Sequence, residues 1–381
     1  MTPKCINFYS CGDSMQLKTW SNVPYFFAKE LEKKGYNLNR INIEPSPFLN
    51  KWYNRISYLV FQRIFRKDAC PIFSRSWIHR AIILGKIRKV TSRTDSEICL
   101  NLFLSYLFYN KYSSKPSVLW CDWSDAIVIQ RIGRKVKKYE KKHLMHEASV
   151  IKNADAVFSM FPTCRNSMEK MYDREIIYLD RNVVNTFYQG DMDFSSIIET
   201  RKNSNSILFI GNQRYQTGLK RLIEAMIDVR RYASDYYIDV IGMDRSLMPS
   251  VPEWVKFHGY LDKGVASENE KYYELLFNAK VLVNPTVGWA GYSSVIEAMY
   301  YATPVVVSSF EDFVEEFGET ISFGAYCRVD DDLSELIKKV IFSSDYVNIA
   351  CMAHSVVKDY TWSRYVDEFL SKLKKMNLLH E

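Results

Sequence analysis

The chain has 381 residues, of which 47% are hydrophobic and 25% are charged, so it is a folded protein large enough for two domains and is not disordered. No run approaches the roughly 20 apolar residues of a membrane span. Residues 1–190 carry 31 Lys and Arg against 16 Asp and Glu, whereas residues 191–381 carry 20 against 28. The basic half indicates an anionic partner, which could be phospholipid, an acidic glycan or nucleic acid.

Cysteine use and the start of the chain both bear on location. The 8 cysteines include no Cys-x-x-Cys pair, which favours free thiols in a reducing cytoplasm over disulfides or zinc. The first residues lack the apolar segment of a signal peptide. We therefore expect a cytoplasmic protein, and peripheral attachment to the inner face of the cell membrane stays open.

The opening of the chain predicts a strand–helix–strand unit. A strand at 5–9 is followed by a polar loop with Asp13, a helix at 23–34 and a strand at 38–43. This order favours a doubly wound parallel sheet. The loop has too few glycines for a dinucleotide fingerprint, so we expect no nicotinamide site.

The next part of the chain is strongly basic. Residues 49–115 are helix-rich and aromatic, and their order is not predicted. A buried strand at 118–121 precedes Asp122 and Asp125, at the strand end where open α/β sheets bind ligands. A helix is expected from about 134 to 152. A solvated helix face and a membrane-surface patch explain its basic run at 131–143 equally well, and nucleic acid ranks lower because no binding motif accompanies the charge.

A second α/β series begins after a polar segment at 188–204. Its most informative part is the stretch from 284 to 299, where an apolar strand enters a glycine-containing turn and a helix opens with Ser293 and Ser294. Backbone N–H groups at such a helix start attract phosphate. Glu297, about one turn into the helix, could accept hydrogen bonds from sugar hydroxyls.

This stretch, with the strand at 305–307, resembles the C-terminal signature of GT-B glycosyltransferases, especially the retaining family-4 type. Glu297 matches the second Glu of the family's paired glutamates, while Trp289 stands where the first would be. Weaker similarities follow in the family's order, at 154–157, 182–187, 207–211, 218–225, 257–260 and 360–362. The resemblance implies an α/β fold with two Rossmann-like doubly wound domains facing across a cleft.

The resemblance also implies a division of the chain. We expect an N-terminal acceptor-binding domain at 1–187, a linker at 188–204, a nucleotide-sugar-binding domain at 205–360, and a helix at 361–381 that packs back on the N-terminal domain.

Two positions depart from the family pattern. Asn212 and Thr217 stand where the family has an Arg and a Lys that contact the donor diphosphate. Arg214, inside the same loop, could substitute, as could Lys220 or Arg221. Alternatively, the donor carries less phosphate charge, as a CMP-linked ulosonic acid does.

The resemblance implies roles for the donor site. Tyr292, Ser293 and Ser294 would meet the phosphate, Glu297 would bind the ribose diol, and Trp289 could stack on the sugar. The whole expected donor site is Gly211, Asn212, Arg214, Trp289, Gly291, Tyr292, Ser293, Ser294 and Glu297. No metal-binding Asp-x-Asp motif is found in a cleft position, so we expect no metal and no cofactor besides the nucleotide-sugar substrate.

Three aspartates are candidates for acceptor-side chemistry, because Asp13, Asp122 and Asp125 all follow strands. An inverting enzyme would need one of them as a general base, and a carboxylate nucleophile is another possibility. A retaining enzyme of the family-4 kind needs no such base.

Taken together, the sequence predicts a metal-independent, retaining glycosyltransferase. It would move a sugar from a nucleotide sugar to a glycan or lipid-linked acceptor in the synthesis of lipopolysaccharide, O-antigen or capsule, at an anionic membrane surface and without nucleic acid. The alternatives are a CMP-ulosonic acid transferase, a sugar-nucleotide epimerase of the same fold, and a non-catalytic, degenerate transferase that acts as a scaffold.

Overall fold

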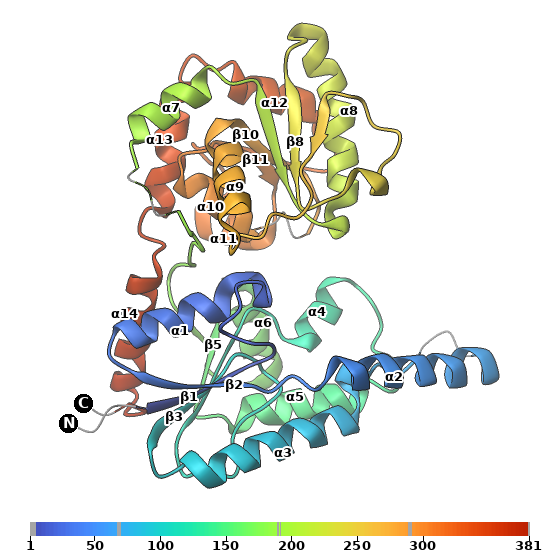
Figure 1. Cartoon of the computed structure of the whole chain (residues 1–381), viewed down its shortest axis with the longest axis vertical. Coiled ribbons are helices and arrows are strands. Elements are labelled where there is room, and N and C mark those ends of the chain that lie inside the picture. Colours follow the sequence, from blue (N-terminus) through green and yellow to red (C-terminus); the bar gives the residue numbers. More distant parts are fainter. Residues whose placement is uncertain (1–4, 67–69, 189, 191, 289–291, 380–381) are drawn as a thin grey trace. The chain divides into compact units, whose positions relative to one another are not determined.

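The computed structural model describes residues 5–66, 70–188, 190, 192–288 and 292–379. Its contacts divide the chain into two compact units (Figure 1). The first unit comprises Met1–Asn182 and Trp362–Glu381, and the second comprises Val183–Thr361.

The first unit is built on a six-stranded parallel sheet with the order β2-β1-β3-β4-β5-β6. Its strands are β1 (Cys5–Ser10), β2 (Asn37–Asn42), β3 (Ile98–Phe103), β4 (Ser117–Cys121), β5 (Ala156–Ser159) and β6 (Ile177–Tyr178). Its α-helices are α1 (Val23–Lys33), α2 (Pro47–Tyr58), α3 (Trp77–Thr94), α4 (Asp125–Arg131), α5 (Lys141–Asn153), α6 (Pro162–Tyr172) and α14 (Trp362–Lys375). Shorter turns are η1 (Thr19–Asn22), the π-helical η2 (Leu59–Ile64) and η3 (Phe73–Arg75).

Local capping sets several helix starts in this unit. The Ser76 hydroxyl accepts a hydrogen bond from the His79 N–H at 3.1 Å, and Ser124 caps α4 in the same way. The single helix expected from about 134 to 152 is wrong at its start. Gly133 adopts a φ of 64°, and helix α5 begins only at Lys141. A left-handed glycine ends a helical stretch, so the basic run begins as a loop.

The last helix, α14, packs on the first unit although it follows the second unit in sequence. The Trp120 indole N–H donates to the Tyr365 hydroxyl at 2.8 Å, and both side chains are buried. Phe27 packs against Trp120, Tyr365 and Phe369. The aromatic residues of α14 therefore complete the core on one face of the first sheet.

The second unit repeats the architecture with a six-stranded parallel sheet of order β12-β11-β10-β7-β8-β9. Its strands are β7 (Ser206–Ile210), β8 (Tyr237–Ile241), β9 (Val255–Phe257), β10 (Ala279–Asn284), β11 (Val305–Ser308) and β12 (Gly324–Cys327). Its helices are α7 (Phe194–Lys202), α8 (Gln216–Tyr232), α9 (Ala266–Asn278), α10 (Tyr292–Tyr300), α11 (Glu311–Phe317), α12 (Leu333–Ile341) and α13 (Tyr346–Val357), with η4 (Gln213–Tyr215) and η5 (Arg245–Leu247).

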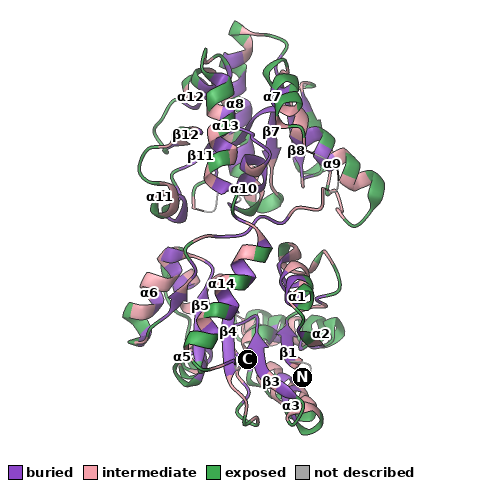
Figure 2. Cartoon of the chain, turned by 90° about the vertical axis from the view of Figure 1, so that its left-hand side faces the viewer, coloured by how far each residue is buried: buried purple, intermediate pink, exposed green. Residues whose placement is uncertain are grey.

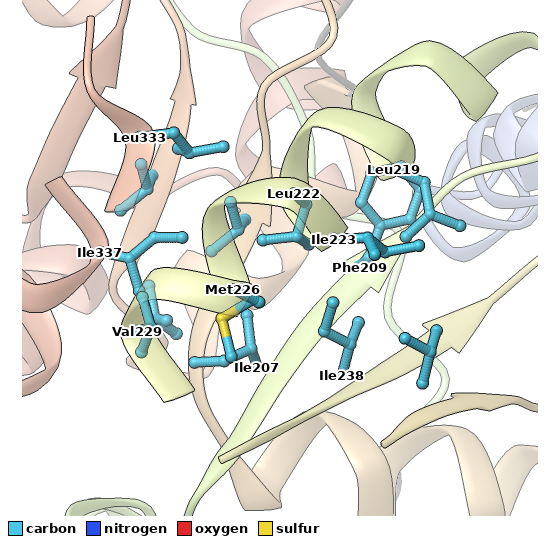
Figure 3. Packing of buried hydrophobic residues seen from close by; sticks show 14 of the residues in the cluster. Ile207, Phe209, Leu219, Leu222, Ile223, Met226, Val229, Ile238, Leu333 and Ile337 are labelled. Atoms are coloured by element: carbon cyan, nitrogen blue, oxygen red, sulfur yellow. The ribbon is translucent and has the colours of Figure 1, made fainter. Parts of the chain in front are cut away.

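The core of this unit follows from the apolar pattern of α8. Leu219, Leu222, Met226 and Val229 recur every three or four residues, which places them on one helix face. That face packs on the sheet and against α12, as Figure 3 shows. In both units the strands are largely buried, while the helices expose their outer faces (Figure 2). The predicted pair of doubly wound α/β domains is confirmed.

Helix α7 occupies most of the segment where polar composition predicts a linker. The Asp193 carboxylate caps it by accepting from the Ser195 and Ser196 N–H groups. Arg201 is fully buried and donates to the carbonyls of Ala279 at 2.7 Å and Ala302 at 2.8 Å. The segment is therefore part of the second unit, because a buried guanidinium needs these carbonyl partners.

Among the described residues, no single helix is long and apolar enough to cross a membrane. One bent pair, Leu333–Ile341 with Tyr346–Lys375, passes this test by length and composition only.

Replacing Tyr365 with Phe should lower the free energy of unfolding by about 1–3 kcal/mol, because the buried Trp120 N–H loses its acceptor. Urea unfolding measures this. The control is Tyr232→Phe, since Tyr232 is 76% exposed and its variant should keep the wild-type midpoint. Equal stability of the two variants would contradict the role of this hydrogen bond.

Candidate functional site

The second unit has a topological switch point between β7 and β10. The chain runs from β7 to β8 on one side, whereas β10 lies on the other side of β7. Crossovers therefore diverge at the carboxyl ends of these two strands, which is where open parallel sheets bind ligands. The two loops at this point begin at Gly211 and at Pro285.

The backbone packs closely at this switch point. A Cβ on Gly218, in the first turn of α8, would lie 2.0 Å from the Thr286 hydroxyl oxygen, so only glycine fits there. Thr286 is 8% exposed, and its hydroxyl oxygen has no hydrogen-bond partner in the described part of the chain. Leaving a buried hydroxyl without a hydrogen bond costs folding free energy. The Thr286 hydroxyl is therefore a group at the switch point that could accept or donate a hydrogen bond to a ligand.

The loop after β7 presents Arg214. The Asn212 side-chain oxygen accepts from the Arg214 N–H at 3.0 Å and so starts η4. Both side chains are exposed, and Arg214 forms no ion pair with any described residue. Asn212 therefore shapes the loop, while the guanidinium is available to an anion. Gly211 contacts Tyr215 closely enough that a Cβ would lie 2.8 Å from it.

Helix α10 opens at the carboxyl end of β10. The Tyr292 hydroxyl donates to Glu316 of α11 at 2.7 Å, so this hydroxyl is already engaged within the unit. Ser293 is exposed and Ser294 is half-buried. Trp289 and Gly291 lie outside the described residues.

Glu297 lies at the centre of a buried polar cluster. Its side chain is 4% exposed, and the Lys263 ammonium contacts both carboxylate oxygens at 2.6 Å. The hydroxyls of Tyr272 and Tyr273 donate to it at 2.9 and 3.1 Å. Burial lowers the pKa of Lys263, and the charge of Glu297 opposes this effect. These contacts fix the carboxylate, so a sugar hydroxyl would have to share it with three protein groups.

These three partners of Glu297 were not predicted. Lys263 lies in a loop and the tyrosines lie on α9, so no short motif connects them with Glu297. Lys263 and Tyr273 also line an open pocket of about 600 Å³, with Phe187, Tyr188 and Phe277 among its other walls. The pocket shows that this cluster reaches a hollow on the surface of the second unit.

In the first unit, Asp13 and Asp122 lie in loops after β1 and β4. Asp13 accepts from the Met15 N–H at 2.9 Å, which makes it a turn-forming residue. Asp122 accepts from the Trp123 N–H at 2.7 Å and from the Trp20 indole at 3.3 Å. The Trp20 contact joins the β1 and β4 loops at one edge of the sheet. Burial raises the pKa of Asp122 above its ordinary value.

The η1 turn in the β1 loop has unusual backbone angles. Trp20, Ser21 and Asn22 have φ values of 39°, 51° and 70°, and none is glycine. Such residues cost about 1–3 kcal/mol each and gather at functional sites. This strain supports a functional role for the loop that positions Trp20 against Asp122.

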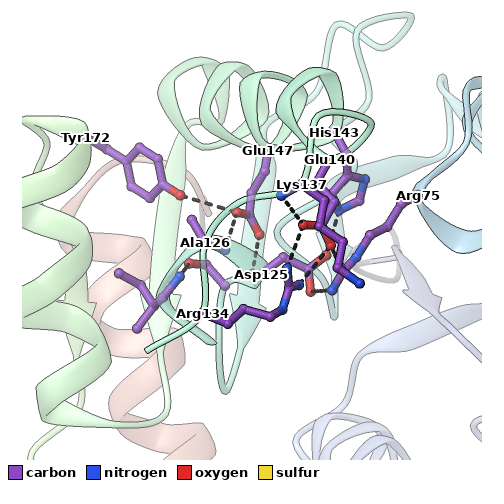
Figure 4. A network of polar contacts seen from close by, with 11 residues as sticks. Arg75, Asp125, Ala126, Arg134, Lys137, Glu140, His143, Glu147 and Tyr172 are labelled. Atoms are coloured by element: carbon purple, nitrogen blue, oxygen red, sulfur yellow. Dashed lines mark hydrogen bonds and ion pairs between the residues drawn. The ribbon is translucent and has the colours of Figure 1, made fainter. Parts of the chain in front are cut away.

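Asp125 belongs to a larger network at the start of α4 (Figure 4). Its carboxylate lies 2.6 Å from His143 Nε2 and 3.7 Å from Arg75. Burial opposes ionisation, but His143 and Arg75 together hold the pKa of Asp125 below its ordinary value. An aspartate that stays ionised is a weak proton acceptor, so Asp125 suits electrostatic positioning better than general-base catalysis.

Two buried glutamates hold this network together. Glu140 accepts two hydrogen bonds from Arg134, at 2.7 and 2.8 Å, and also contacts Arg75. Burial by itself would raise the pKa of Glu140, but these pairings lower the pKa to about 2. Glu147 accepts from the N–H groups of Asp125 and Ala126, and burial raises its pKa to about 7. No local pattern predicts the contact of Arg75 with Glu140 or that of Glu147 with the start of α4, because these groups come from separate elements. Arg134 and Glu140, in contrast, lie in the one loop before α5.

Within the described residues, no group of three His, Cys, Asp or Glu side chains is arranged to hold a metal ion.

Comparison with known proteins identifies the second unit. Residues 204–342 match the family model described as glycosyl transferases group 1. This range spans β7 to α12 and so contains both loops of the switch point and Glu297. The segment is therefore a group 1 glycosyltransferase domain. No curated protein sequence is significantly similar to the chain.

Solved structures of the same fold cover nearly the whole chain. Sucrose-phosphate synthase from Thermosynechococcus elongatus is 14% identical, with a TM-score of 0.67 over 98% of this chain and 99% of that one. HepE from Anabaena, solved with UDP and glucose, is 12% identical, with a TM-score of 0.61 over 96% and 99%. WaaG, a glycosyltransferase involved in lipopolysaccharide biosynthesis, is 13% identical, with a TM-score of 0.57 over 93% and 95%. The predicted GT-B fold is confirmed.

Replacing Lys263 with Met should lower the free energy of unfolding by about 3–5 kcal/mol, because it leaves the Glu297 carboxylate buried without its cation. The matched control is Lys271→Met. Lys271 also pairs with a glutamate, Glu274, but both side chains are about half exposed, so the loss should stay below about 1 kcal/mol. Urea unfolding of both variants measures these changes. An equal decrease in the free energy of unfolding would show that the buried pair stabilises the fold no more than the exposed pair does.

Proposed function

We propose that this chain, a glycosyltransferase with a group 1 domain at residues 204–342, transfers a sugar from a nucleotide-sugar donor to a glycan or lipid-linked acceptor of a surface polysaccharide, without a metal and with retention at the anomeric carbon. One observation carries the proposal. The segment that matches the group 1 family model contains both switch-point loops and the helix that bears Glu297. HepE in complex with UDP-glucose supports the donor class, and WaaG supports the acceptor class.

The donor would bind at the carboxyl ends of β7 and β10. Its phosphates would meet the N–H groups at the start of α10, near Ser293 and Ser294, where the helix dipole favours negative charge. Arg214 would contact the same phosphates from the β7 loop, since its guanidinium is exposed and lacks an ion-pair partner in the described structure. These groups stabilise the negative charge that develops on the leaving phosphate.

The sugar end and the ribose would use different residues. Glu297 would accept hydrogen bonds from the ribose diol while Lys263 keeps it oriented. The unused Thr286 hydroxyl would gain a partner when the donor occupies the switch point. Trp289 and Gly291 are proposed as donor-site residues from the sequence resemblance alone.

On the acceptor side, Asp122 suits proton transfer better than Asp125 does. Burial raises the pKa of Asp122, which brings it closer to the working range of a general base, whereas Asp125 is held ionised by His143. In a retaining reaction the donor phosphate takes the acceptor proton, and both aspartates would then orient the acceptor. Asp13, which closes its own turn, fits an orienting role.

One observation favours the CMP-ulosonic acid transferase as a second candidate. The family's Arg and Lys are replaced by Asn212 and Thr217, so the β7 loop offers Arg214 as its cation inside η4. A donor with a single phosphate needs fewer cations than a diphosphate donor.

Thermal-shift titration with UDP, UDP-glucose and a CMP-linked ulosonic acid should show stabilisation by one nucleotide class, since a ligand that binds the native state raises its melting temperature. Arg214→Ala should weaken that binding by about tenfold or more, because it removes a charge-assisted hydrogen bond. The control is Arg231→Ala, at the far end of α8, where Arg231 pairs with Asp228. Wild-type affinity in Arg214→Ala would remove this residue from the donor site. Absence of any nucleotide binding would favour the scaffold alternative.

Sugar transfer should continue at an unchanged rate after the protein is dialysed against EDTA, because backbone N–H groups and Arg214 would carry the phosphate charge without a metal. Product formation measured with and without added Mg²⁺ or Mn²⁺ tests this. Activity that disappears with chelator and returns with either cation would contradict a metal-independent mechanism.

A further inference from the structure

The segment formed by α2 and η2 projects from one end of the first unit (Figure 1). It carries large apolar side chains that are between 42% and 69% exposed, although such residues are usually buried. These are Phe48, Leu49, Trp52, Ile56, Leu59 and Ile64. A contiguous set of this kind marks an interaction surface, which we call the α2 face.

Helix geometry places the α2 face away from the rest of the unit. At about 100° per residue, Phe48, Trp52 and Ile56 fall within a sector of about 80°, and Ser57 falls on the opposite side. Ser57 is buried and donates to the Pro71 carbonyl at 2.6 Å. Tyr53 packs on Phe73 from the same inner side. The inner side therefore holds the helix to the unit, and the apolar side faces outward.

The α2 face is bordered by positive charge. Lys51 and Arg55 lie next to the apolar stripe on the helix, and Arg63 follows in η2. In sequence, residues 45–94 contain eleven Lys and Arg and a single acidic residue, Asp68. Apolar and aromatic residues bordered by basic ones are the composition that binds anionic lipid, and the near absence of acidic residues in this stretch favours a partner that is uniformly negative.

We propose that the α2 face docks on an anionic phospholipid bilayer. Trp52, Phe48 and Ile56 would enter the boundary between headgroups and acyl chains, while Lys51 and Arg55 would contact lipid phosphates. This inference goes beyond the proposed function, since it concerns a surface of the first unit and needs no assumption about the sugar. It would place the protein at the layer where a lipid-linked acceptor lies.

The basic run at 131–143 is the competing membrane surface. Part of its charge is used internally, because Arg134 is paired with the buried Glu140. Its exposed apolar residues are Ile132 and Val136, without an exposed aromatic ring among the described side chains of this run. It therefore supplies a matched control.

Co-sedimentation with vesicles tests the proposal. The wild-type chain should bind vesicles of phosphatidylcholine mixed with phosphatidylglycerol and should not bind phosphatidylcholine alone. The variants Trp52→Ser/Ile56→Ser and Lys51→Glu/Arg55→Glu should each lose about tenfold or more of this binding, since each removes two contacts to the bilayer. The control Ile132→Ser/Val136→Ser should bind as the wild type does.

Several results would overturn the proposal. These are no binding of the wild type to mixed vesicles, equal binding to both lipid compositions, or wild-type binding by the two α2-face variants. A solution dimer that the α2-face variants dissociate would instead identify the face as a contact between copies of the chain. Because the altered residues are exposed, circular dichroism should show folded variants. Nucleotide binding by thermal shift should be unchanged in them, which separates failure of this inference from failure of the proposed function.

Discussion

The parallel direction of both sheets is the constraint on which the rest of the structure depends. When every strand runs the same way, all carboxyl-end loops of a unit meet at one edge of its sheet. Residues from distant parts of the chain are thereby brought together, as Trp20 and Asp122 are in the first unit. In the second unit the same constraint places the loops after β7 and β10 side by side at the switch point.

Burial then decides the chemistry of the groups at these edges. Glu297 is removed from water, so it is held by a lysine and two tyrosines instead of by solvent. Asp122 and Asp125 lie three residues apart in sequence, yet their pKa values move in opposite directions because Asp125 has His143 and Arg75 beside it. Two carboxylates of one loop can therefore serve different purposes.

The two units differ in what they expose. The second unit buries some of its charged side chains in internal contacts, such as Arg201 on the Ala279 carbonyl and Lys263 on Glu297. The first unit carries the surplus of basic residues and the apolar α2 face together. Under the two proposals made above, the second unit would bind a small anionic donor and the first unit would meet a larger anionic surface.

The sequence by itself determined the fold class and the presence of a helix that follows the fourth strand of the second unit. Apolar runs of strand length that alternate with amphipathic helices predict a parallel α/β sheet. The serines at 293 and 294 are residues that favour the start of a helix, whatever the rest of the fold. The prediction of one long helix through the basic residues was wrong, because Gly133 interrupts that stretch. The polar segment at 188–204 contains helix α7, which Asp193 caps.

Only the tertiary structure decided which side chains share a site. Lys263 meets Glu297, and Glu147 meets the start of α4, across separations that no local pattern encodes. The outward direction of Trp52 was likewise decided by packing, because an apolar helical residue is expected in a core unless another face of its helix is already held there. Propensity and periodicity act between near neighbours in the chain, whereas pairing of buried charges depends on distances set by the assembled fold.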